Sequence, residues 1–116
     1  MQIVTPAEAV VGIRSGDQVY LHCAAATPEV LLDALVARAD ELRGVGVVHL
    51  HCEGPGPHLA PEFSASFRHR ALFIGPNARA AVNEGRADYV PVFLSDVPRL
   101  FRSGALPLDV VFVNAT

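Results

Sequence analysis

The regular alternation of short apolar segments with helical segments constrains this fold more than any other feature of the sequence. Four segments have the length and composition of buried strands: "QVYLHC" at 18–23, "VGVVHLH" at 45–51, "RALFIG" at 70–75 and "LDVVFV" at 108–113. Strand–helix alternation of this kind is typical of a parallel sheet with helices packed on it. We therefore expect an α/β fold with an open, mostly parallel sheet and helices on both faces.

The segment between the first two strands predicts the longest helix, over 28–42. Leu31, Leu35 and Leu42 recur at helical spacing, Thr27 is the expected N-cap, and Gly44 follows the end. Shorter helices are expected after the capping box "TPAE" at 5–8, over 76–85, and over 95–104 with Ser95 as its cap. Residues 87–94 are expected to be extended, with Pro91 favouring an edge strand.

The length and composition indicate one packed domain, residues 1–116. The chain is 51% hydrophobic and has a mean hydropathy of +0.33, which excludes a disordered chain. No apolar run approaches the roughly 20 residues that span a bilayer, and the N-terminus has no basic region of a secretory signal. With only Cys23 and Cys52, no disulfide framework is expected, and we predict a cytoplasmic protein with reduced thiols.

The charge distribution argues against a nucleic-acid partner. The formal net charge is −3, lysine is absent, and no basic stripe is visible. Residues 1–67 contain three arginines and eight acids, whereas residues 68–116 contain six arginines and four acids. The second half could help to hold a small anion, or it could be an ordinary solvated surface.

The segment "HLHCEGPGPH" at 49–58 has several side chains that can bind a metal. His49 and His51 fall on one face of a strand, while Cys52 falls on the other, and no C-x-x-C or H-E-x-x-H motif is present. We expect no metal here, and no tightly bound cofactor. The two histidines are more simply explained as hydrogen-bonded polar side chains packed under a helix.

Ligands of open α/β sheets bind beyond the carboxyl ends of the strands, which directs attention to the loops 24–27, 52–61 and 75–77. Glu53 could meet a ligand or be a solvated acid, Asn77 could bind a ligand or cap its helix, and Arg79 could reach a ligand or solvent. Dinucleotide-binding, P-loop and nucleophile-elbow motifs are absent from the sequence. The candidate substrate-binding residues are Ala25, Ala26, Thr27, Glu53, Gly54, Asn77 and Arg79.

Longer stretches resemble a known family. The run from Phe67 contains "FRH", "FIGPNAR", "VNEGRADYVPVFLS" and "PRLFRSGALPLDV", and it follows "SGDQVYLHCAAATPEVLLDAL" and "VVHLHCEGPGP" in order. Together these pieces resemble the N-terminal domain of the acetyl-CoA hydrolase/transferase family, which includes 4-hydroxybutyrate and acetate CoA-transferases. The resemblance covers essentially the whole chain and implies a CoA-transferase-like fold.

What the resemblance implies is transfer of coenzyme A between an acyl-CoA and a small carboxylic acid, or hydrolysis of the acyl-CoA. A glutamate carboxylate attacks the thioester, and an enzyme–CoA thioester follows. In the family this glutamate lies in a later part of the chain, so no catalytic residue is assigned in 1–116. The implied partner is a C-terminal half or a second copy of the chain. The alanines of "HCAAATP" depart from the family's glycine-bearing loop, so a positive φ there would cost more free energy.

Two alternatives stay open beside the enzyme half. The chain could be a non-catalytic fragment that serves as a binding or interaction module with the same fold. It could also be a metal or redox protein that uses His49, His51, Cys52 and Cys23. A thioester exchange assay separates the first alternative from the enzyme, and metal analysis tests the second.

Overall fold

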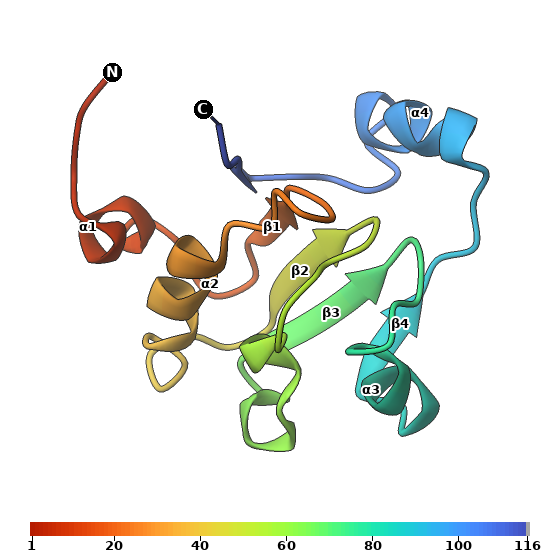
Figure 1. Cartoon of the computed structure of the whole chain (residues 1–116), viewed down its shortest axis with the longest axis horizontal. Helices are drawn as coiled ribbons and strands as arrows, with labels where there is room; N and C mark the ends of the chain where they lie inside the picture. The colour runs from red at the N-terminus through yellow and green to blue at the C-terminus, as the bar shows by residue number, and fades with distance from the viewer. Residues whose placement is uncertain (116) are drawn as a thin grey trace.

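The computed structural model describes residues 1–115. This part of the chain contains one five-stranded sheet. Its strand order is β4-β3-β2-β1-β5, and every neighbouring pair is parallel. Figure 1 shows β1 to β4 side by side in this order. The strands are β1 (Gln18–Leu21), β2 (Val45–His49), β3 (Phe67–Ala71), β4 (Ala87–Tyr89) and β5 (Val110–Phe112). The parallel α/β architecture expected from the alternation is confirmed.

Four α-helices and three short 3₁₀ helices connect these strands. They are α1 (Pro6–Val10), α2 (Glu29–Val36), α3 (Arg79–Asn83), α4 (Val97–Arg102), η1 (Pro57–Leu59), η2 (Pro61–Phe63) and η3 (Leu94–Asp96). The helix α2 is the longest of them, as predicted, but it ends at Val36 rather than near 42. Beyond it the chain turns more tightly, because Arg38 and Ala39 donate to the carbonyls three residues back. Leu42 is buried all the same.

The larger core lies between α1 and α2 and one face of the sheet. Val19 and Leu21 of β1 point into it, as do Leu32 and Leu35 of α2. Tyr20 points the other way and packs edge-on against Phe101 of α4, with ring centroids 5.6 Å apart. Because side chains alternate along a strand, the pattern of "QVYLHC" correctly predicted this division.

A smaller apolar cluster lies on the opposite face, under α4. Its buried members are Val48, Leu72, Val97 and Leu106. This face has fewer buried residues than the α2 face, and large apolar side chains nearby remain exposed, including Phe93 at 79% and Leu94 at 67%. The sheet is therefore covered more completely on one side than on the other.

All five strands differ from their expected bounds, and β3 and β4 differ most. The strand β3 runs from Phe67 to Ala71, so it starts three residues before the expected 70–75 and ends four residues before it, because this is the segment that pairs with β2 from Val45 to His49. The expected extended segment 87–94 pairs only over Ala87–Tyr89. Pro91 has no N–H to donate, so pairing cannot continue along the edge.

The helix caps were predicted with mixed success. The capping box at Thr5 and Glu8 is confirmed, since each side chain bonds the other residue's backbone N–H. The prediction that Thr27 caps α2 is wrong: the N-cap is Pro28, and the Thr27 hydroxyl donates to the Ala24 carbonyl. Ser95 does not cap α4 either, whose N-cap is Asp96.

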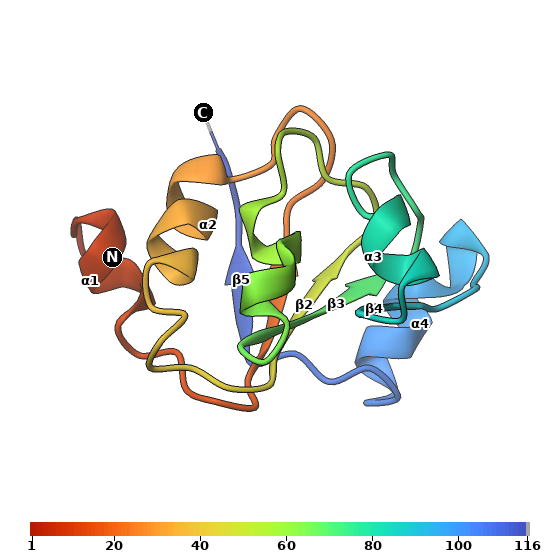
Figure 2. The ribbon, with the colours of Figure 1, turned by 90° about the horizontal axis from the view of Figure 1, so that it is seen from below.

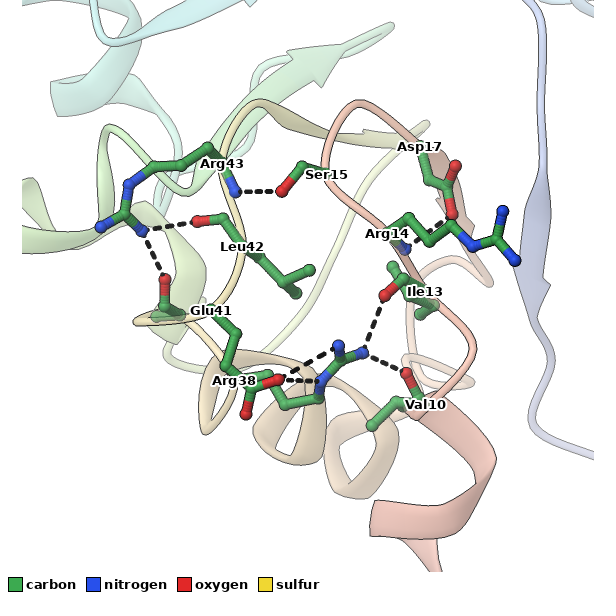
Figure 3. A network of polar contacts seen from close by, with 10 residues as sticks. Val10, Ile13, Arg14, Ser15, Asp17, Arg38, Glu41, Leu42 and Arg43 are labelled. Carbon is green, nitrogen blue, oxygen red and sulfur yellow. Dashed lines mark hydrogen bonds and ion pairs between the residues drawn. The ribbon is translucent and has the colours of Figure 1, made fainter.

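Arginines on the turns after α2 tie the N-terminal segment to the rest of the domain (Figure 3). The Arg38 guanidinium donates to the carbonyls of Val10 and Ile13, at 2.5 and 2.9 Å, across the gap between α1 and α2. The Arg43 N–H donates to the Ser15 hydroxyl. Arg38 thus adds a charged donor to the Val10 carbonyl, which also accepts from the Ile13 N–H, and it gives the Ile13 carbonyl, just after α1, a donor.

Candidate functional site

Three loops meet at the carboxyl edge of the sheet, as Figure 2 shows for the loops after β1, β2 and β3. The Glu53 N–H donates to Thr27 Oγ1 at 3.1 Å, which joins the second loop to the first. Asn77 Nδ2 donates to the carbonyls of Cys52 and Gly54, each at 3.2 Å, which joins the third loop to the second. Parallel strands place their ends at one edge, and these side chains then fix the loops to one another.

Asn77 therefore holds a loop in place rather than capping a helix. The helix α3 begins at Arg79 with Ala78 as N-cap, and no side chain bonds to its first turn. The two carbonyls that Asn77 binds flank Glu53 on both sides. Asn77 is thus a positioning residue for Glu53, and the capping interpretation of Asn77 is wrong.

A surface cavity of about 470 Å³ opens between the first two loops. Its lining residues are Ala24, Ala25, Thr27, Pro28, Glu29, Val30, Leu31, Glu53, Val113 and Asn114. The first turn of α2, which has no side-chain cap, borders this cavity, and its N–H groups carry the positive end of the helix dipole. The cavity therefore combines these N–H donors with the carboxylates of Glu29 and Glu53.

Three of the seven predicted binding residues line this cavity, and four do not. Ala25, Thr27 and Glu53 line it. Ala26 donates its N–H to the Cys23 carbonyl, and Gly54 adopts a φ of +87° next to the Glu29 side chain. Arg79 is exposed at the start of α3 and, like Asn77, does not line the cavity.

Ala24 adopts a left-handed backbone conformation, with φ of 52°. This conformation costs an alanine on the order of 1 kcal/mol more than a glycine. Its N–H donates to the His51 carbonyl at 2.7 Å, and Ala24 also forms a parallel bridge with Cys52. The loop therefore has at Ala24 the left-handed turn that a glycine would adopt easily, and the bridge between Ala24 and Cys52 stabilises this turn.

His51 pairs with Glu53, a contact that the sequence argument missed. Nε2 of His51 lies 3.1 Å from Oε1 of Glu53, and the two side chains are 39% and 60% exposed. The imidazole also lies close to Gly75, where a Cβ would be 3.0 Å from its Nδ1. The sequence signal for this pair is the H-x-E spacing of His51 and Glu53 directly after a strand, because residues two apart in an extended segment share a face.

The other histidines of this region form a buried chain. His69 contacts His49 through their Nε2 atoms, and its Nδ1 lies 2.8 Å from Nε2 of His58. Burial lowers the pKa of His49 to about 4 and that of His58 to about 3, and burial beside both neighbours lowers the pKa of His69 as well. All three are neutral near pH 7 and hold β2, β3 and η1 together. His49 and His51 therefore have different partners.

Within residues 1–115, no group of three or more His, Cys, Asp or Glu side chains is arranged to hold a metal ion. Both cysteines are free thiols. Burial raises the pKa of Cys52 to about 12, so this thiol is a poor nucleophile and a poor metal ligand at neutral pH. The half-buried Cys23 contacts the Tyr20 hydroxyl at 3.1 Å.

The helices of the described chain, residues 1–115, include none with the length and apolar character needed to cross a bilayer.

Comparison with known proteins gives a consistent result. The acetyl-CoA hydrolase/transferase N-terminal domain matches residues 1–116. A succinyl-CoA:acetate/propanoyl-CoA:succinate CoA transferase from Fasciola hepatica is 41% identical over 106 residues, 90% of this chain and 22% of the relative. A 4-hydroxybutyrate coenzyme A transferase from Clostridium kluyveri is 38% identical over 115 residues, 99% of this chain and 27% of the relative.

A solved structure shares the fold. RipA from Yersinia pestis superposes with a TM-score of 0.82 at 25% identity, over 95% of this chain and 28% of the RipA chain. The present chain thus spans about a quarter of the length of the proteins that it matches.

Proposed function

Because this chain belongs to the acetyl-CoA hydrolase/transferase family, as its N-terminal domain, we propose that it is the substrate-side domain of an enzyme acting on acyl-CoA. The enzyme moves coenzyme A between an acyl-CoA and a small carboxylic acid, or hydrolyses the acyl-CoA. The observation that carries this proposal is the match over the whole chain, supported by two CoA-transferase relatives.

The cavity beside Glu53 is the proposed site for the acyl group or the free carboxylate. Ala25 lines it, and the Ala25 N–H donates no hydrogen bond within residues 1–115. This N–H and the uncapped first turn of α2 are suitable donors for the carbonyl oxygen of a thioester or for a carboxylate. Glu53 forms one wall, held by Thr27 and Asn77.

The covalent chemistry is assigned to a glutamate outside this chain. That carboxylate attacks the acyl-CoA thioester and releases the CoA thiolate, which leaves an acyl-glutamyl anhydride. The thiolate attacks the glutamyl carbonyl, releases the first carboxylic acid and forms a glutamyl-CoA thioester, and a second carboxylic acid takes the CoA by the reverse of these two steps. Residues 1–116 supply donors and a pocket wall rather than the nucleophile. A C-terminal portion of the enzyme, or another subunit, is the proposed partner, and coenzyme A acts as a substrate rather than a resident cofactor.

The test is an exchange assay with two proteins. One is chain 1–116 alone, and the other is the same chain fused to the C-terminal three quarters of the Clostridium kluyveri relative. After incubation with acetyl-CoA and butyrate, mass spectrometry should detect butyryl-CoA only with the fusion. A folded fusion without exchange would contradict the proposal, whereas exchange by the chain alone would place the nucleophile in residues 1–116.

A further inference from the structure

We propose that the free edge of β5 is the surface on which the part of the enzyme outside residues 1–116 docks. This part adds a strand parallel to β5 and a helix on the α4 side of the sheet. The inference rests on the proposed function, because the occupant is the C-terminal portion proposed there. It names the surface of this domain that is bound and the kind of structure that binds it.

The sheet of residues 1–115 ends at β5, which pairs on one side only, with β1. The Phe112 carbonyl accepts from the His22 N–H, so the backbone of Phe112 faces β1. Backbone groups of successive residues in a strand point to opposite sides, so the N–H and C=O of Val111 face the free edge. Such free donors and acceptors pair readily with another strand.

One face of β5 is covered and the other is bare. Phe112 is buried in the larger core, and Val110 packs against that core. Val111 is in register with Tyr20, projects to the α4 face like Tyr20, and is 52% exposed. Tyr20 and Leu108, which lies just before β5, line an apolar groove of about 410 Å³ beside α4. The α4 face of the sheet therefore has apolar surface next to β5 that no helix of residues 1–115 covers.

The path of the chain predicts which structure fills this surface. The steps from β1 to β2 and from β3 to β4 run toward β4, whereas the step from β4 to β5, through α4, runs the other way. Crossovers between parallel strands are almost always right-handed, so steps in opposite directions place their helices on opposite faces. The helix α2 packs on the larger core and α4 on the smaller cluster of the other face. A strand added beyond β5 continues the direction of the α4 step, so its connecting helix lies on the α4 face, over Val111.

The opposite edge of the sheet is a poorer place for an added strand. The edge strand β4 pairs over Ala87–Tyr89, and Pro91 follows it without an N–H to donate. A strand that came after β5 would also reach that edge only by a connection across the whole sheet, and such connections are usually short. The relatives have chain enough for the added elements, since this chain covers 22% and 27% of their lengths.

Hydrogen exchange at single-amide resolution tests the added strand, in dilute chain 1–116 and in the fused enzyme. The Val111 amide should exchange at least about 100-fold more slowly in the fusion, because the added strand accepts its hydrogen bond. The Phe112 amide, which faces β1, is the internal control and should be protected in both proteins. Fast exchange of Val111 in the fusion would overturn the proposal. Protection of Val111 in chain 1–116 that grows with concentration would also overturn it, and would assign the edge to a second copy.

Thiol labelling tests the added helix. Val111→Cys should react with iodoacetamide at least about tenfold more slowly in the fusion than in dilute chain 1–116, because a covering helix excludes the reagent. Val11→Cys is the matched control, at a 70% exposed valine directly after α1, and should react equally in both proteins. Peptide mass spectrometry separates these thiols from Cys23 and Cys52. Equal rates for Val111→Cys in the two proteins would contradict the proposed helix.

The two proposals fail in different ways. A folded fusion without CoA transfer contradicts the proposed function, and the exchange and labelling measurements still decide the docking surface. A fusion that does not fold counts against the docking surface, because the segment of the relative would then not fit the β5 edge.

Discussion

The buried imidazoles of His49, His58 and His69 give the fold a predictable response to acid. Their pKa values lie below the ordinary 6.5 of histidine, mainly because burial disfavours the charged ring. The unfolded chain therefore binds more protons than the folded chain below about pH 6.5. The contribution of these neutral imidazoles to the free energy of unfolding is fully present above pH 6.5. It falls as the pH drops toward about 4, where His49 protonates in the folded state.

We expect the free energy of unfolding to fall by up to about 4 kcal/mol per pH unit between pH 6 and 4.5, about 1.4 for each ring. Urea titrations at several pH values measure this slope. His58→Leu should reduce the slope by about a third, and His22→Leu, outside the cluster, is the control. An equal slope in His58→Leu and in the parent would show that the cluster does not control acid stability.

Asn77 is the residue on which the arrangement of the loops depends. Asn77→Ala removes donors from the Cys52 and Gly54 carbonyls, so we expect a loss of about 1–3 kcal/mol in the free energy of unfolding. The exchange of the Glu53 and Gly54 amide hydrogens should also accelerate. Asn83→Ala, at an exposed position of α3, should change neither measurement. Equal effects of the two substitutions would contradict the assigned role of Asn77.

At the scale of elements, the attachment of α1 depends on a single arginine. The helix has five residues and one fully buried side chain, Val10, so packing alone holds it weakly. Arg38→Ala leaves the Val10 and Ile13 carbonyls without their charged donor, and we expect a loss of about 2–3 kcal/mol. Thermal or urea unfolding checks this value. Arg102→Ala, at an exposed position of α4, should have little effect, and a similar loss there would contradict the argument.

The sequence was sufficient for the order and type of the elements because each strand has a clear apolar pattern. The bounds were less predictable. The helical spacing of Leu35, Ala39 and Leu42 continues through tight turns after Val36, since such turns bury the same side chains. The start of β3 at Phe67 depends on its register with β2, a contact between distant segments that no local pattern shows.

The candidate site was predictable only in its position. Parallel strand ends brought Glu53 and Thr27 together, as the fold class required. The positioning role of Asn77 and the pairing of His51 with Glu53 depend on side-chain directions in the folded loops. The assignment of Ala25, Ala26, Thr27, Glu53, Gly54, Asn77 and Arg79 to substrate binding stays a prediction.

At the scale of the whole molecule, the α4 side of the sheet carries two adjoining apolar grooves. They have volumes of about 410 and 440 Å³ and share Leu50 and Leu94. Phe73 and Leu94 are exposed by 62% and 67% on this side. Exposed apolar surface of this kind favours association.

We therefore expect chain 1–116 by itself to self-associate through these grooves. Sedimentation velocity should show a coefficient that rises with concentration, and Leu94→Asp should abolish the rise. Val11→Asp, at an exposed apolar position directly after α1, should leave the rise of the sedimentation coefficient unchanged. A coefficient independent of concentration in the parent chain would contradict the expectation.

The central claim is that the cavity beside Glu53 receives the acyl group or its carboxylate. The most direct measurement is kcat/KM for the carboxylate in the fused enzyme, compared between Glu53→Gln and Glu62→Gln. Both carboxylates are exposed, but only Glu53 lines the cavity. We expect at least a tenfold change in kcat/KM for Glu53→Gln, about 1.4 kcal/mol, and less than a twofold change for Glu62→Gln. Equal values for the two variants would contradict it.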